Sequence, residues 1–184
     1  LVMPATVALV GASERPGSVG RIVLENILGG EFRGEFFPVN PNHRKVLGRK
    51  SYESLASIGK HVDLAVIVTP ASILRSVLES GAKVKLRAAI VVTEPPAGDP
   101  AQQRRWTREI GQVASKHGIR LVGPGAFGLV RTDIGLNASI TDVPVVPGRL
   151  ALVAQSGAVC TAMLDFAAPM GIGFSNVISL GAGV

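Results

Sequence analysis

Residues 11–20, GASERPGSVG, have the composition of a loop that binds phosphate. Glycines at positions 11, 17 and 20 let a ligand approach the backbone closely. An apolar run precedes the loop and a helical pattern follows it, so the loop leads from a strand into the first turn of a helix, whose N–H groups attract anions. We predict that this loop binds a phosphate-bearing ligand. A tight strand-to-helix turn without a ligand is the alternative.

The spacing of these glycines fits neither of two common phosphate loops. The dinucleotide pattern G-x-G-x-x-G is absent, and no Lys follows Gly17 to complete a P-loop. Beyond the second predicted strand, an NAD enzyme offers a carboxylate to the ribose, but PVNPN places Asn40 and Pro41 there. This argues against NAD. Lys45 is placed to meet a phosphate beyond that strand, although a solvated lysine fits the pattern equally well.

Alternating strands and helices surround this loop. Short apolar runs predict five buried strands, at residues 6–11, 35–41, 63–70, 88–94 and 119–125. The stretches between them show helical spacing, and in the first helix we expect one face to bury Val19, Ile22, Val23 and Ile27. Such alternation is typical of an α/β fold with a Rossmann-like, doubly wound parallel sheet, in which ligands bind beyond the carboxyl ends of the strands.

The pattern changes after Gly128 and restarts at Arg149. Residues 1–128 are predicted to form the first domain, and residues 129–148 to cross between domains with some extended structure. Residues 149–184 then read as one strand–helix–strand unit, which is small for a complete parallel domain. We therefore expect the chain to be part of a longer protein.

The overall composition describes a globular chain. Of its 184 residues, 47% are hydrophobic and 17% charged, enough to form a core. The apolar runs are too short for a membrane span, and no signal peptide is recognisable, so a cytoplasmic location is expected. The single cysteine, Cys160, allows no internal disulfide and is predicted to be a small buried residue.

A net charge of +6 is compatible with a polyanionic partner, such as a phosphorylated cofactor. The basic residues are spread along the chain, and only one Trp and one Tyr are available to stack on bases. We expect neither nucleic acid nor a membrane as a partner.

Six segments together resemble a known family. They are VALVGASERPGSVG, FFPVNPN, AVIVTPA, VVTEPP, IRLVGPGAFG and LALVAQSGA. Their order and spacing resemble the CoA-binding half of the NDP-forming (ADP-forming) acyl-CoA synthetases, relatives of the succinyl-CoA synthetase α subunit, over nearly the whole chain. The resemblance implies a CoA-binding domain followed by the start of a flavodoxin-like α/β domain.

The resemblance also implies a role for each strand-end loop. The turn for the phosphates and pantetheine of CoA comprises Gly11, Ala12, Ser13, Gly17, Val19 and Gly20. The residues implied to flank the nucleotide are Pro38, Asn40, Pro41 and Lys45. Val68, Thr69 and Pro70 are implied on the adenine side, and Thr93 and Glu94 toward the thiol. Ser156 and Gly157 open a helix whose N-terminus receives the phosphate of a phosphohistidine, with simple N-capping as the alternative for Ser156.

Two features depart from the family pattern. The family has G-P-N where this chain has GPGAFG, so Gly125 replaces an amide expected near the acyl phosphate or carboxylate substrate. The phosphorylated histidine of the family lies beyond residue 184, and His43, His61 and His117 fit no such motif. We therefore expect this chain to bind CoA without a catalytic residue or metal site of its own, and Mg²⁺ and ATP or NDP to bind elsewhere.

The reaction implied by the resemblance converts a carboxylate, CoA and a nucleoside triphosphate into acyl-CoA, nucleoside diphosphate and phosphate through acyl phosphate and phosphohistidine intermediates. Implied partners are a small carboxylate or acyl-CoA, a downstream ATP-grasp region or subunit, and further subunits of a homo- or hetero-oligomer. One alternative is the synthetase-like regulatory region of a GNAT-type protein-lysine acetyltransferase. Another is a redox-sensing or transcriptional CoA- or NAD-binding module, against which Asn40 and the lack of a helix-turn-helix pattern argue.

Overall fold

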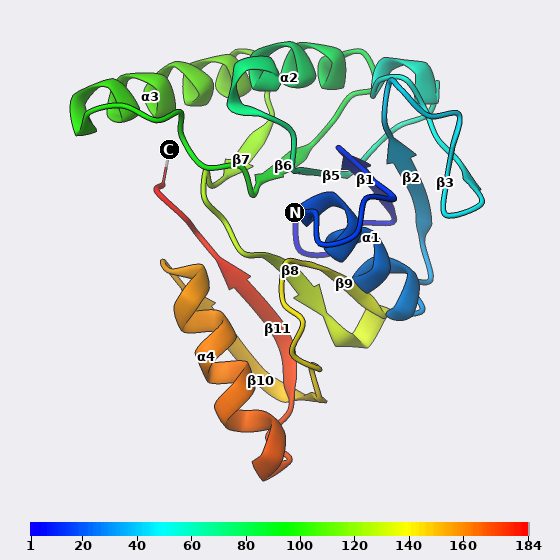
Figure 1. The fold of residues 1–184 in the computed structure, drawn as a ribbon, viewed down its shortest axis with the longest axis vertical. Coiled ribbons are helices and arrows are strands. Elements are labelled where there is room, and N and C mark those ends of the chain that lie inside the picture. The colour runs from blue at the N-terminus through cyan, green and yellow to red at the C-terminus, as the bar shows by residue number, and fades with distance from the viewer. Residues whose placement is uncertain (184) are drawn as a thin grey trace.

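Five parallel strands form the first sheet, as the spacing of the apolar runs predicts (Figure 1). The structure is a computed structural model that describes residues 1–183. The strands are β1 (Thr6–Val10), β2 (Glu35–Val39), β5 (Leu64–Ile67), β6 (Ala88–Val91) and β7 (Arg120–Val122). Their order in the sheet is β2-β1-β5-β6-β7. The chain runs outward from β1 to β2 and then crosses to β5, so the switch point at which such sheets bind ligands lies between β1 and β5.

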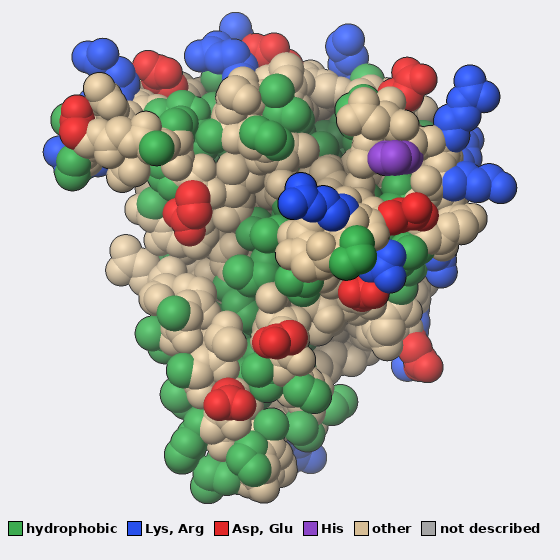
Figure 2. Space-filling view, in the orientation of Figure 1, with side chains coloured by type: hydrophobic (Ala, Val, Ile, Leu, Met, Phe, Trp, Pro, Cys, Tyr) green, Lys and Arg blue, Asp and Glu red, His purple; other side chains and the backbone are tan. Residues whose placement is uncertain are grey.

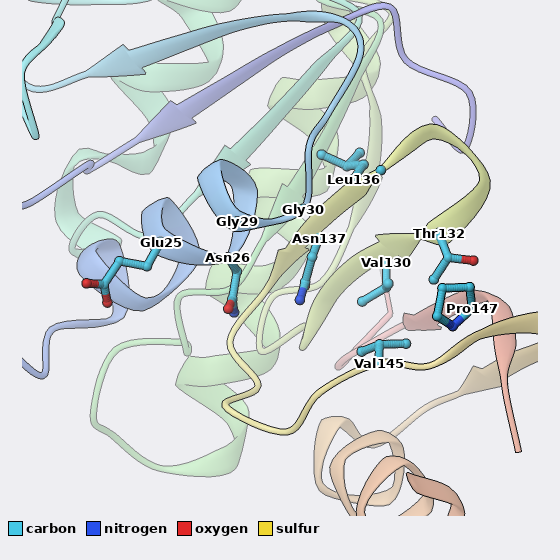
Figure 3. A pocket seen from close by; sticks show the side chains of 11 residues that line it. Glu25, Asn26, Gly29, Gly30, Val130, Thr132, Leu136, Asn137, Val145 and Pro147 are labelled. Carbon is cyan, nitrogen blue, oxygen red and sulfur yellow. The ribbon is translucent and has the colours of Figure 1, made fainter. Parts of the chain in front are cut away.

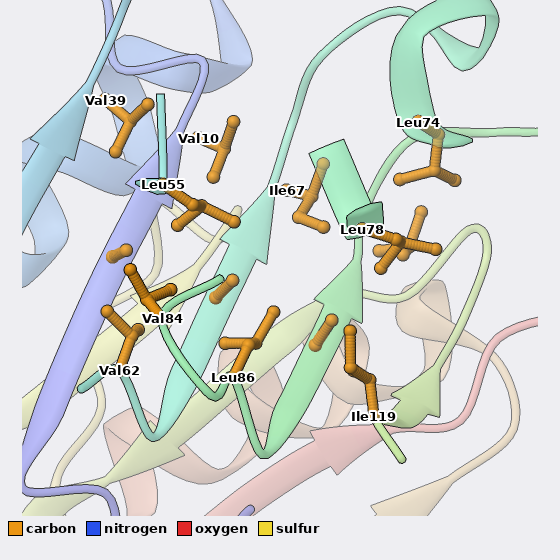
Figure 4. Close-up of a cluster of buried hydrophobic side chains, with 14 of the residues drawn as sticks. Val10, Val39, Leu55, Val62, Ile67, Leu74, Leu78, Val84, Leu86 and Ile119 are labelled. Carbon is orange, nitrogen blue, oxygen red and sulfur yellow. The ribbon is translucent and has the colours of Figure 1, made fainter. Parts of the chain in front are cut away.

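The two faces of this sheet are covered by different elements. Helices α2 (Leu74–Ala82) and α3 (Pro100–Lys116) cover one face, and α1 (Val19–Gly29) lies on the other (Figure 1). Because side chains alternate along a strand, Val10 packs into the core under α2 and α3 while Leu9 packs under α1. Figure 4 shows the first of these cores.

The buried face of α1 differs from the predicted one. Val23 and Ile27 are buried as expected, but the other buried positions are Gly20 and Leu24, while Val19 is 43% exposed. The helix is rotated about its axis relative to the predicted orientation, because Gly20, which has no side chain, packs against the backbone of Gly11.

A second sheet contains the C-terminal part of the chain. Its strands are β10 (Pro147–Ala154), β11 (Phe174–Ser179), β8 (Gly128–Arg131) and β9 (Leu136–Ser139), in the order β10-β11-β8-β9. Strands β10 and β11 are parallel, the other pairs are antiparallel, and α4 (Gly157–Ala167) packs on this sheet. The buried thiol of Cys160 lies in this core, as predicted.

Residues 129–148 were expected to cross between domains with some extended structure, and strands β8 and β9 confirm the extended structure. The structure adds that these strands belong to the second sheet while Leu129, Leu136 and Ala138 pack against α1 and the first sheet. The domain boundaries at 128 and 148 stay predictions.

Shorter elements complete the fold. A hairpin of two-residue strands, β3 (Lys45–Val46) and β4 (Arg49–Lys50), follows β2 and forms a separate two-stranded sheet, with Val46 buried in the core under α1. Turns of 3-10 helix occupy Ala56–Ile58, Ala71–Ile73, Thr132–Ile134 and Ala168–Met170. Within the described residues, no helix is both long and apolar enough to cross a membrane.

The end of α1 joins the two sheets. The Asn26 amide donates hydrogen bonds to the carbonyl oxygens of Ser139 and Thr141, at 2.9 and 2.7 Å. Gly30 and Gly135 approach so closely that a Cβ on Gly30 would lie 2.5 Å from the Gly135 oxygen. A cavity of about 280 Å³ remains beside this joint (Figure 3). The residues that line this cavity come from the end of α1 and from the second sheet with its adjoining segments. We therefore attribute the cavity to the packing of α1 against the second sheet.

Asp63 connects the starts of β1 and β5 at the amino edge of the first sheet. One of its carboxylate oxygens accepts hydrogen bonds from the N–H groups of Ala5 and Thr6 and from the Thr6 hydroxyl. The Thr6 hydroxyl in turn accepts from the Asp63 N–H at 2.8 Å, and the other carboxylate oxygen contacts His61. Burial alone raises the pKa of Asp63, but the hydrogen bonds from Ala5, His61 and Thr6 outweigh burial and hold the pKa below its ordinary value.

The first prediction concerns this carboxylate. Because its pKa is lowered on folding, Asp63 stabilises the fold fully above about pH 3.9, and this stabilisation is lost as the pH falls through the lower folded-state pKa. We expect Asp63→Asn to reduce the free energy of unfolding by about 1–3 kcal/mol at pH 7, measured by urea titration. The difference from the unchanged chain should shrink toward pH 2.

The matched control is Asp165→Asn, because Asp165 is exposed on α4. This variant should unfold like the unchanged chain at both pH values. A difference for Asp63→Asn that is absent at pH 7, or equally large at pH 2, would contradict the assigned role.

Candidate cofactor-binding site

The glycine-rich loop lies at the switch point of the first sheet, directly after β1. Ser18 caps α1, with its hydroxyl oxygen accepting from the Arg21 N–H at 3.3 Å. The N–H groups of Arg21 and Ile22 bond to Ser18, whereas those of Val19 and Gly20 have no acceptor in the described chain and remain available to a ligand beyond the strand ends. Val19 is the first residue of this turn and is 43% exposed. The loop therefore has the geometry of an anion site.

Each glycine of this loop meets a different requirement. Gly11 and Gly17 have φ of +97° and +72°, a region in which residues with a Cβ are strained. A Cβ on Gly20 would overlap the carbonyl oxygen of Gly11, whereas the space around Gly17 is open. The glycine at 20 thus allows strand and helix to touch, and the one at 17 allows the turn.

Asn40 holds this loop in place. Its side-chain N–H donates to the Ala12 carbonyl oxygen at 2.7 Å, and its side-chain oxygen accepts from the Asn42 N–H at 2.8 Å. Both the N–H and the oxygen of this amide are therefore used to hold the backbone. Asn40 stands at the place where an NAD enzyme has a ribose-binding carboxylate. Ala12 is fully buried, and the Ser13 hydroxyl accepts from the Arg15 N–H at 3.1 Å.

Glu14, which sequence reasoning missed, connects the loop to the β3–β4 hairpin. Its carboxylate accepts a hydrogen bond from the Leu47 N–H at 2.5 Å. The hairpin and the residue before it carry four exposed cations, Arg44, Lys45, Arg49 and Lys50. Figure 2 shows basic side chains at this edge of the molecule. The predicted Lys45 thus sits on an element that is hydrogen-bonded to the loop.

A cavity of about 290 Å³ lies where β1, β2 and β5 end. Of the residues predicted to flank the nucleotide and adenine, Pro41 and Thr69 line it, together with Gly11 from the loop. Pro38 is buried within β2, Pro70 is exposed, and Val68 is packed beside Gly11, and none of these three lines the cavity. The Thr93 hydroxyl donates to the Thr69 carbonyl oxygen at 2.5 Å, which links this cavity to the loop after β6.

A larger cavity, of about 820 Å³, lies between the carboxyl ends of the two sheets. It brings together four predicted residues that come from distant parts of the chain: Glu94, Gly125, Ser156 and Gly157. Sequence reasoning missed Gln103, Gln155 and Thr161, polar residues that also line it. Gln155 lies within the segment LALVAQSGA, but the resemblance assigns it no role. No motif marks Gln103 and Thr161, because only the fold brings α3 and α4 to the same cavity.

The chemistry of the larger cavity is set by two features. Gly125 has φ of +70°, and a Cβ there would lie 2.8 Å from a carboxylate oxygen of Glu94, so Glu94 occupies the space that a side chain at 125 would take. Ser156 stands at the N-cap of α4, but in the described chain its hydroxyl makes no capping hydrogen bond. The helix N-terminus and the Ser156 hydroxyl can therefore both bind an anion.

A parallel sheet with a glycine-rich loop at its switch point, and cavities beyond its strand ends, defines a Rossmann-like nucleotide-binding domain. The family model described as CoA binding domain matches residues 5–132. The chain belongs to this CoA-binding family, and its cofactor is CoA. A second model, described as succinyl-CoA ligase like flavodoxin domain, matches residues 147–184, in agreement with the predicted start of a flavodoxin-like domain.

Similar proteins are ADP-forming CoA ligases. The chain is 36% identical to acetate–CoA ligase (ADP-forming) I of Archaeoglobus fulgidus, over 98% of this chain and 26% of that protein. It is 34% identical to the α subunit of acetate–CoA ligase (ADP-forming) I of Pyrococcus furiosus, over 98% of this chain and 40% of the subunit. The chain thus spans less than half the length of either relative.

A solved structure shares the fold. Acetyl-coenzyme A synthetase 1 of Ca. Korarchaeum cryptofilum, described as dinucleotide forming and in complex with phosphate and ADP, superimposes with a TM-score of 0.91 at 30% identity. The match covers 98% of this chain and 38% of that one.

The second prediction tests the strand-to-helix contact. Gly20→Ala should lower the free energy of unfolding by about 1–3 kcal/mol, because the added Cβ must push the Gly11 backbone away. Gly29→Ala in the same helix is the control: its Cβ would meet nothing within 4 Å, so stability should hold or rise by about 0.5–1 kcal/mol. Equal effects of the two changes would contradict the assigned contact.

Proposed function

We propose that this chain supplies the CoA site of an ADP-forming acyl-CoA synthetase, which converts a carboxylate, CoA and ATP into acyl-CoA, ADP and phosphate. The observation that carries the proposal is the larger cavity, in which Glu94 and Gly125 of the first sheet face Ser156 and Gly157 of the second. A thiol and a phosphorylated group must meet in this reaction, and the cavity offers a carboxylate opposite a helix N-terminus.

CoA lies along the carboxyl edge of the first sheet in this proposal. Its nucleotide end takes the smaller cavity, its phosphates lie over the glycine loop near Lys45, and its pantetheine arm reaches the larger cavity. The loop fits such a ligand because Gly17 leaves open space beside the first turn of α1. When bound, CoA supplies the thiol that accepts the acyl group.

The sequence places Glu94 only toward the thiol and predicts no catalytic residue in this chain, but in the proposed reaction Glu94 is the proton acceptor for that thiol. Among the described residues that line the larger cavity, Glu94 is the one with a carboxylate. As the sulfur attacks the acyl phosphate carbonyl, the carboxylate takes the thiol proton, and phosphate leaves with the electron pair of the broken C–O bond. The N-terminus of α4 stabilises that phosphate by its free N–H groups and the Ser156 hydroxyl.

Other parts of the enzyme complete the reaction. In this proposal the ATP and Mg²⁺ sites belong to an ATP-grasp region or subunit, and the phosphorylated histidine belongs to the segment that follows residue 184. Among the described residues, strand β10 lies at an edge of its sheet and exposes apolar side chains such as Val153. Helix α4 exposes Phe166, and the 3-10 turn after it exposes Met170. Exposed apolar surface of this kind supports a continuation of the second sheet and contact with further domains or subunits. A cytoplasmic location and an oligomeric state are part of the proposal.

The acetyltransferase alternative receives no support, because the relatives described above carry ligase names. A histidine in the segment that follows residue 184 would favour the synthetase. Its replacement, with an attached acetyltransferase domain, would favour the regulator.

The third prediction is a ligand preference. The chain should bind CoA and 3′-phospho-ADP more tightly than NAD by isothermal titration, because the residue after β2, where an NAD enzyme has a ribose-binding carboxylate, is Asn40, and its amide is committed to the Ala12 carbonyl. Gly17→Val should weaken CoA binding through strain at φ of +72°. Tighter binding of NAD, or unchanged CoA affinity in this variant, would overturn the proposal for the loop.

The fourth prediction concerns Glu94. In the full-length protein, Glu94→Gln should slow thioester formation by about 10²–10⁴-fold while the Kd for CoA stays near that of the unchanged enzyme. Glu79→Gln, on the exposed surface of α2, is the control and should leave both unchanged. A normal rate for Glu94→Gln would exclude Glu94 as the proton acceptor.

A further inference from the structure

Gly125 lies directly beside the carboxylate that the proposed reaction uses as its proton acceptor. A Cβ added at Gly125 would stand 2.8 and 3.1 Å from the two carboxylate oxygens of Glu94, and 3.2 Å from the carboxyl carbon. These three nearest atoms all belong to the end of one flexible side chain, and none of them is a backbone atom. The carboxylate therefore covers the face of Gly125 from which a side chain would project, in the larger cavity that both residues line.

Hydrogen bonds hold the backbone on both sides of this contact. The Gly125 N–H donates to the carbonyl oxygen of Thr93, the residue before Glu94, at 3.0 Å. The Ala126 N–H donates to the Val91 carbonyl oxygen, also at 3.0 Å. Because these bonds fix the two backbone segments against each other, a side chain added at 125 has to displace the Glu94 carboxylate.

The Glu94 carboxylate has no polar partner that would fix it instead. The salt bridges of the described residues use four other carboxylates, those of Glu25, Glu35, Asp63 and Asp133. Glu94 is exposed, and in the described chain its side chain makes neither an ion pair nor a hydrogen bond. The place of this carboxylate is therefore set by the space that Gly125 leaves free.

We propose that Gly125 is a positioning residue for thioester formation. Because it has no side chain, it lets the Glu94 carboxylate lie where the CoA thiol gives up its proton. The inference rests on the proposed function, which assigns that proton to Glu94. Gly125 thus acts through Glu94, and it offers the acyl group no side chain of its own.

The turn at Gly125 makes a second demand, which the test has to separate from the first. Its φ of +70° strains any residue that has a Cβ, and this strain acts on folding rather than on the carboxylate. Gly118 has a nearly equal φ of +68°, but a Cβ there would meet nothing within 4 Å. Gly118→Ala therefore introduces the same backbone strain without displacing a side chain, which makes it the matched control.

The test follows two partial reactions of the full-length protein. Gly125→Ala should slow thioester formation from acetyl phosphate and CoA by about 10–100-fold, because a catalytic group displaced by about 1 Å loses much of its effect. Phosphorylation of the protein by labelled ATP and the Kd for CoA should stay unchanged. Gly118→Ala should leave all three quantities unchanged and lower the Tm to a similar extent.

A second set of variants separates positioning from general damage. Glu94→Asp withdraws the carboxylate by one methylene, away from a Cβ at 125. In the Glu94→Asp protein, Gly125→Ala should therefore slow thioester formation by less than about threefold further, so the two changes are not additive. Gly125→Asn should slow the unchanged protein as Gly125→Ala does, since Asn tolerates a positive φ but adds the same Cβ.

Two results would overturn the positioning role and leave the proposed function in place. One is an equal loss from Gly125→Ala with and without Glu94→Asp, and the other is an unchanged rate for Gly125→Ala alone. A normal rate for Glu94→Gln, or an unchanged protein that forms no thioester, would overturn the proposed proton transfer itself.

Discussion

The contact between the backbone of Gly11 and Gly20 is the constraint on which the binding edge depends. Because a Cβ at 20 would overlap the Gly11 oxygen, the helix can begin directly against the end of β1 only with glycine there. This contact places the first turn of α1 next to the space beyond the carboxyl ends of the strands. Asn40 then fixes the loop to β2 through the Ala12 oxygen, and Glu14 fixes the hairpin to the loop. The first turn of α1, the end of β2 and the β3–β4 hairpin are thus all held in place by contacts with the glycine-rich loop.

The larger cavity depends on a second set of contacts, which join the carboxyl ends of the two sheets. The Gly123 N–H donates to the Leu180 oxygen at 3.1 Å, and the Ala182 N–H donates to the Pro124 oxygen at 2.8 Å. These bonds connect the loops after β7 and β11. They keep the N-terminus of α4 opposite the loop that carries Glu94, so the proposed chemistry needs both sheets in one arrangement.

The sequence predicts the five-stranded sheet well because each strand is a continuous apolar run between turn residues. The hairpin of β3 and β4 is missed because two-residue strands have no periodicity. Strands β8 and β9 lack clear alternation because both of their faces are buried. The anchoring role of Asn40 also escapes sequence reasoning, since its partner lies 28 residues away.

A crystal structure of the chain with CoA tests the central claim, that the cofactor runs along the carboxyl edge from the smaller cavity to the larger one. The account predicts adenine in the smaller cavity beside Thr69, phosphates over residues 11–17, and the sulfur within hydrogen-bond distance of Glu94. A thiol in the smaller cavity, or a base stacked over Ser156, would contradict it.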